Sequence, residues 1–67
     1  MTTDFEIRRR DRQHLASLLK MKRTMLGIQN IPELSHALNA EIRDVIAGML
    51  EEDVALVEKL YEVKALN

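Results

Sequence analysis

Apolar residues recur every three or four positions along much of this chain, and polar residues fill the positions between them. This spacing is typical of helices that bury one face. The apolar positions of the first clear helix are Leu15, Leu18, Leu19, Met25 and Leu26. Those of a later helix are Ile42, Val45, Ile46, Met49 and Leu50. Those of the last helix are Val54, Val57, Leu60, Tyr61 and Leu66. The pattern predicts an all-α protein.

Turn and capping residues predict where these helices begin and end. Gly27 suits the end of the first helix, since glycine tolerates a positive φ. Asn30 is placed to cap a short second helix of about 32–38, with Glu33 three positions later as in a capping box. Asn39-Ala40 then separates this second helix from the third.

The boundary before the last helix has two interpretations. The acidic run Glu51-Glu52-Asp53 is a polar break, and Asp53 is able to cap a helix that follows. The alternative is one long helix from Glu41 to about Ala65. We favour the break.

Two short helices so close in sequence must cross at a steep angle, which is a helix-turn-helix. The predicted fold is therefore a small all-α bundle of four short helices, or five, with the helix-turn-helix at 32–38 and 41–50. We expect a single domain over residues 1–67, with a basic N-terminal arm at about 4–13.

Composition limits the class of protein. A chain of 67 residues with 46% hydrophobic and 31% charged residues is typical of a small folded protein with a thin core. It has no cysteine, so neither a disulfide nor a thiolate metal site can form. No apolar run approaches the roughly 18 residues of a membrane span, and no signal-peptide pattern opens the chain. We expect a cytoplasmic protein.

Charge is unevenly distributed. Residues 1–33 carry seven Lys or Arg against four acids, a net charge of +3, whereas residues 34–67 carry three against seven, a net charge of −4. The first half is therefore predicted to contact phosphate groups or an acidic partner. The candidate residues are Arg8, Arg9, Arg10, Arg12, Lys20, Lys22 and Arg23. The alternative for the arm is a solvated helix face without a partner.

No catalytic constellation can be assembled from this sequence. His14 and His36 lack the spacing of a metal-binding pair. Gly27 and Gly48 lie too far apart to form a phosphate-binding loop. We therefore expect neither an enzyme nor a bound metal or cofactor.

The middle of the chain resembles the helix-turn-helix of the Cro and phage-repressor family, over about residues 18–50. The matching positions are Lys20, Lys22, Arg23, Leu26, Gly27, Glu33, Leu34, Ser35, Leu38 and Val45. Asn39 stands where that family usually has a turn glycine. The resemblance implies a transcription regulator whose third helix enters the major groove of DNA.

The residues that would face the groove argue for a protein partner instead. They are Glu41, Ile42, Arg43, Asp44 and Ala47. Arg43 suits guanine, but Glu41 and Asp44 would face a polyanion with one charge per ~1.7 Å of duplex. Ile42 adds apolar surface that suits a core or a protein contact.

These observations favour a small phage-type transcription regulator that acts largely through protein contacts. Its partner would be a component of the transcription machinery, such as RNA polymerase, or another regulator, with DNA contact by the basic arm as an option. The first alternative is a repressor that reads double-stranded DNA with helix 41–50. The second is a structural helical-bundle dimer that does not bind DNA. The basic and acidic halves also permit head-to-tail self-association, and the apolar face of the last helix permits a symmetric dimer.

Overall fold

The computed structural model describes residues 4–28 and 32–66. Within these residues the chain forms three helices and no strand. They are α1 (Asp4–Ile28), α2 (Pro32–Ala47) and α3 (Glu51–Tyr61). The predicted all-α class is confirmed, whereas the predicted number of four or five helices is wrong.

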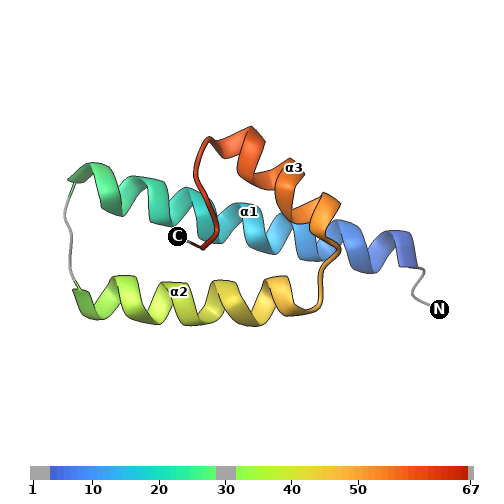
Figure 1. Ribbon diagram of the computed structural model, residues 1–67, viewed down its shortest axis with the longest axis horizontal. Coiled ribbons are helices and arrows are strands. Elements are labelled where there is room, and N and C mark those ends of the chain that lie inside the picture. Colours follow the sequence, from blue (N-terminus) through green and yellow to red (C-terminus); the bar gives the residue numbers. More distant parts are fainter. Residues whose placement is uncertain (1–3, 29–31, 67) are drawn as a thin grey trace.

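Helix α1 is the central element of the fold. Figure 1 shows α2 returning antiparallel to α1 on one side, while α3 follows the direction of α1 on another side. The molecule is elongated, with extents of 41 × 20 × 17 Å. Among the side chains that the structure describes, the buried apolar core is small and consists of Leu15, Leu18, Leu19, Ile42, Val57 and Ala65. Each buried leucine or isoleucine stabilises the fold by about 1.5–3 kcal/mol.

The predicted basic arm is the first half of α1 and not a separate segment. Asp4 and Glu6 lie in the first turn, where carboxylates interact favourably with the positive end of the helix dipole. No glycine or proline interrupts the chain between Asp4 and Lys20. The helix also continues through Gly27 to Ile28, so the predicted end at Gly27 is one residue short. The predicted cap at Asn30 lies outside the described residues.

Helix α2 is continuous through Asn39 and Ala40, so the predicted helix-turn-helix does not form. Asparagine costs a helix only about 0.6 kcal/mol relative to alanine, and alanine is the best helix former. The apolar positions Leu38, Ile42 and Val45 keep their helical spacing across the predicted turn and pack on the core. Packing along one uninterrupted face therefore outweighs a weak turn signal.

The favoured break between the last two helices is confirmed, but it lies earlier than predicted. The N–H groups of Gly48 and Met49 donate to the carbonyls of Val45 and Ile46 (3.2 and 3.1 Å), which closes the end of α2 with tight turns. Leu50 is extended (φ −75°, ψ 144°), and α3 begins at the next residue. Asp53 is therefore inside the helix and is not its cap.

The last helix ends at Tyr61, well short of the predicted end near Leu66. Glu62 adopts a left-handed conformation (φ 54°, ψ 38°), and the Val63 N–H donates to the Glu58 carbonyl (3.3 Å). Residues 63–66, which we call the tail, leave the helix and turn back toward α1. No described helix combines the length and the apolar character needed to cross a membrane.

Candidate functional site

An ion-pair cluster joins the beginnings of α1 and α3. Arg8 donates from Nε and Nη2 to the two carboxylate oxygens of Asp53 (2.9 and 3.0 Å) and from Nη2 to Glu52 (3.1 Å). Arg12 adds a longer contact to Asp53 at 3.4 Å. Asp53 is only 4% exposed. Two arginines of the predicted binding set therefore fasten α3 to α1.

The same contacts set the protonation of the pair. The hydrogen bonds from Arg8 lower the pKa of Asp53, and its charge and the contacts of Arg12 act in the same direction. The hydrogen bond to Asp53 in turn raises the pKa of Arg8. Both groups are therefore held in their charged forms, and the bidentate geometry fixes their orientation.

A second cluster holds the tail against α1. The buried Lys22 ammonium donates to the carbonyls of Lys64 and Ala65 (3.1 and 3.0 Å). Burial lowers the pKa of Lys22, and the charge of Glu58 opposes this shift. The Glu58 carboxylate accepts the Ala65 N–H at 2.7 Å. The tail is thus tied on both sides, and Ala65 joins the core.

Arg23 extends this fastening by donating to the Tyr61 carbonyl at the end of α3 (3.2 Å). Four of the predicted cations therefore donate hydrogen bonds within the protomer: Arg8, Arg12, Lys22 and Arg23. The remaining predicted cations, Arg9, Arg10 and Lys20, are exposed on α1. These three form no ion pair within 4–28 and 32–66.

The predicted recognition residues are divided between the core and the surface of α2. Ile42 is fully buried against α1 and cannot reach a ligand. Arg43, Asp44 and Ala47 are exposed together on the outer side of the helix. Glu41 lies 3.8 Å from the His14 ring on α1, an ion pair when that histidine is protonated.

A groove runs between α1 and α3, and we call it the α1–α3 groove. Its volume is about 200 Å³. The lining includes Arg9, Gln13, Ala16, Leu56, Leu60 and Tyr61. Leu56 and Leu60 are 49% and 69% exposed, whereas Val57 is buried and Tyr61 is partly buried against the core. The apolar face predicted for the last helix is therefore divided, because Val54, Val57 and Tyr61 pack at the core whereas Leu60 lies outward with Leu56.

A second apolar surface lies between α1 and α2, and we call it the hairpin face. Its hollow of about 350 Å³ is lined by Met21, Met25, Leu34, Ala37, Leu38 and Glu41. Met21 is 49% exposed and Leu34 is 53% exposed. The lining comes from α1 and α2 alone, because α3 and the tail cover a different side of this helix pair.

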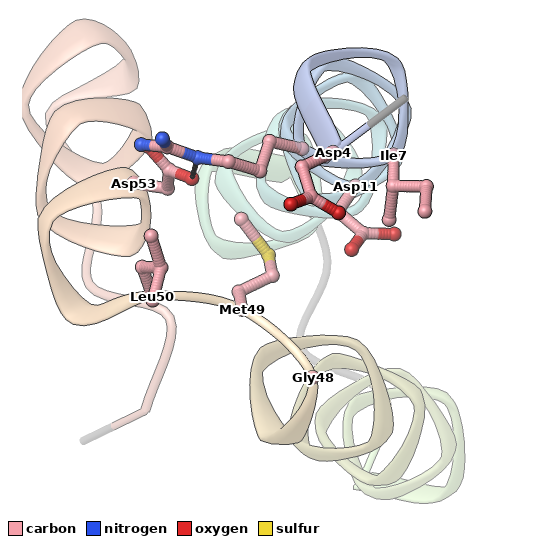
Figure 2. A pocket seen from close by; sticks show the side chains of 8 residues that line it. Asp4, Ile7, Asp11, Gly48, Met49, Leu50 and Asp53 are labelled. Atoms are coloured by element: carbon pink, nitrogen blue, oxygen red, sulfur yellow. Dashed lines mark hydrogen bonds and ion pairs between the residues drawn. The ribbon is translucent and has the colours of Figure 1, made fainter. Parts of the chain in front are cut away.

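A third hollow of about 330 Å³ lies at the beginning of α1. Figure 2 shows Asp4 and Asp11 beside the Gly48–Leu50 connection, and Ile7 on the side of α1 away from α3. The Asp53 carboxylate at its edge already accepts from Arg8. Across the described ranges, no three His, Cys, Asp or Glu side chains gather as they would around a metal ion.

Comparison of the chain with family models, curated proteins and solved structures found no match.

Proposed function

We propose that this chain is a small regulator that acts through protein contacts, and that the α1–α3 groove binds an amphipathic helix of the partner. The observation that carries the proposal is the exposed pair Leu56 and Leu60. These residues lie four positions apart on one face of α3, with the small side chain of Ala16 beside them in the groove. Exposed leucines along a shallow apolar groove can bind the apolar face of an amphipathic helix.

The charge around the groove favours a partner helix with acidic flanks. Arg9 lines the groove and forms no ion pair with any described residue. Lys59 is exposed on α3, next to Leu60. The nearby Glu52 is already bound by Arg8. Complementary charge at a rim speeds association and selects among partners.

DNA contact is the alternative function, and the fold gives it less support. A role in transcription was predicted from the resemblance over residues 18–50. That resemblance depends on a helix-turn-helix, and α2 is continuous through the predicted turn. Arg9, Arg10 and Lys20 remain available for phosphate groups. Three cations would give weak binding with a shallow salt dependence.

In-cell photo-cross-linking tests the proposal. A photoreactive amino acid replaces Leu60 in one variant and Arg43 in the matched control, where the side chain is exposed on α2. We expect a discrete adduct with another protein from position 60, none from position 43, and loss of the adduct when Arg9→Glu is added. The same adduct from both positions, or none from position 60, would overturn the groove assignment.

Fluorescence anisotropy separates the DNA alternative. The labelled probes are a duplex from upstream of the gene and an unrelated duplex of equal length, each measured at low and near-physiological salt. We expect weak binding that is equal for both and vanishes at the higher salt. Selective binding that survives the higher salt would favour a DNA-binding regulator and contradict our proposal.

A further inference from the structure

The hairpin face extends along most of the α1–α2 pair. Ile7, His14 and Met21 are spaced by seven residues and therefore lie in one row on α1. Ile7 and Met21 are 44% and 49% exposed, and Figure 2 shows Ile7 on the side of α1 away from α3. Leu34 and Leu38 continue the surface on α2. One side of the helix pair thus holds an apolar surface that α3 and the tail leave open.

We propose that the hairpin face binds the same face of a second copy, so that two protomers form an antiparallel four-helix bundle. The two-fold axis runs along the helices, and α1 of each copy lies beside α2 of the other. This inference concerns a different surface from the α1–α3 groove and does not rest on the function proposed for that groove.

The protomer exposes more surface than a compact monomer of its mass. The chain exposes 5200 Å². A folded monomer of this mass exposes about 4,300 Å². The excess of roughly 900 Å² is close to the ~800 Å² that one partner buries in a standard protein interface. An interface of standard size on the hairpin face would therefore remove an area comparable to this excess.

The charges beside the hairpin face select the arrangement of the two copies. On the α1 edge, Arg10 lies one turn before His14, and Lys20 lines a hollow with Met21. On the α2 edge, Asp44 lies one turn after Glu41, and Glu33 precedes Leu34. At these positions the α1 edge is therefore basic and the α2 edge acidic, and Glu6, one turn before Arg10, adds an acid near the start of the α1 edge.

His14 and Glu41 are in contact, so they lie at the same height along the antiparallel helices α1 and α2. This height is the reference level for the other charges. Arg10 and Asp44 both lie about 5–6 Å from that level in one direction, and Lys20 and Glu33 lie about 9–12 Å from it in the other. Rotation about a two-fold axis parallel to the helices leaves the height of each residue along that axis unchanged. Arg10 then faces Asp44 of the second copy, and Lys20 faces Glu33 of the second copy.

The other symmetric arrangement places α1 against α1 and α2 against α2. It would set the basic edge against itself and the acidic edge against itself, which is unfavourable. In our arrangement, the two His14–Glu41 pairs meet at one level inside an apolar interface. A single polar layer of this kind fixes register and orientation at some cost in stability.

Sedimentation equilibrium of the full chain tests the dimer. We expect twice the chain mass for the native protein and for Leu60→Glu, which changes the α1–α3 groove. Leu34→Glu should weaken the dimer roughly 100-fold, because its charge would be buried against apolar side chains. Unchanged far-ultraviolet circular dichroism shows that the helices persist. A native protein that stays monomeric at millimolar concentration, or a Leu34→Glu variant that stays dimeric, would overturn the proposal.

Charge reversal at exposed positions tests the arrangement without disturbing the fold. Arg10→Glu and Asp44→Arg should each weaken the dimer about tenfold, because each change occurs twice in a symmetric pair. The double variant should regain native affinity. Double variants no tighter than the single ones would overturn the proposed axis.

The two proposals fail independently in these measurements. Monomeric Leu34→Glu should retain the cross-link from position 60, because its α1–α3 groove is intact. Dimeric Leu60→Glu should lose groove binding. In the otherwise native chain, a dimer that gives no cross-link from position 60 would therefore count against the groove alone. A chain that gives this cross-link but stays monomeric would count against the dimer alone.

Discussion

Arg8 and Asp53 lie 45 positions apart in sequence and form a two-point ion pair, with Nε–Oδ2 at 2.9 Å and Nη2–Oδ1 at 3.0 Å. This pair holds the first turn of α3 against the second turn of α1. It gives a contact within the protomer to a basic residue that the sequence predicted either to contact a partner or to lie on a solvated helix face. Part of the charge asymmetry between the two halves of the chain is therefore satisfied by ion pairs within the protomer.

The pair predicts a loss of stability in acid. Because Arg8 lowers the pKa of folded Asp53, the unfolded chain, with an aspartate pKa of about 3.9, binds more protons as the pH falls. The stability from this pair is present above about pH 4 and is lost as the pH falls through the pKa of folded Asp53. Urea midpoints measured from pH 7 to pH 2 should show this decline.

The variant Arg8→Met should have a lower urea midpoint at pH 7 and a flatter decline below pH 4, because its Asp53 pKa moves toward the unfolded value. Arg10→Met is the matched control, measured below the concentration at which the chain self-associates. It should follow the native curve. Parallel curves for Arg8→Met and the native protein would contradict the assignment.

The Lys22 contacts predict a stability loss that differs from that of a surface lysine. Lys22→Met keeps the length and the apolar packing of the side chain but leaves the carbonyls of Lys64 and Ala65 without their donor. We expect the free energy of unfolding to fall by about 1–3 kcal/mol. Lys20→Met, with an exposed side chain, should change it by less than about 0.5 kcal/mol. Equal losses in urea unfolding would show that the tail contacts contribute nothing.

The helical periodicity of the sequence located the helical segments, but it was not used to decide whether the segments before and after Asn39-Ala40 form one helix. Leu34, Leu38 and Ile42 follow one another at four-residue spacing through the predicted turn at Asn39-Ala40. That spacing is the signal of one helix, and it competes with the capping chemistry of asparagine. Burial of Ile42 against α1 decides the outcome, and this energy is not visible in a local turn motif.

The candidate binding residues were identifiable as cations, but their pairing was not. A local sequence pattern does not show that Arg8 meets Asp53, since the contact depends on how α3 returns along α1. The bond from Lys22 to backbone carbonyls has no side-chain signature at all. The seven-residue spacing of Ile7, His14 and Met21 and the four-residue spacing of Leu34 and Leu38 were the local signals for the hairpin face.

Substitution at Asn39 separates a continuous helix from a turn. In a helix interior, Asn39→Gly should be less stable than Asn39→Ala by about 1 kcal/mol, because glycine has more conformational freedom to lose. A helix-turn-helix would reverse this order, since glycine is preferred at a left-handed turn position. Thermal unfolding of the two variants compares them directly. Ala40→Gly should cost a similar amount and serves as the control.

The end of α3 offers a stabilising substitution. Glu62 adopts a left-handed conformation, which costs a non-glycine residue about 1–2 kcal/mol. Glycine removes this cost but loses about 0.5–1 kcal/mol more backbone entropy on folding. We therefore expect Glu62→Gly to raise the free energy of unfolding by about 0.5–1 kcal/mol. Glu62→Ala removes the same charge and retains the strained Cβ, so it should bring no such gain in urea unfolding. If alanine stabilised as much as glycine, the effect would come from charge, and the backbone conformation would not be its cause.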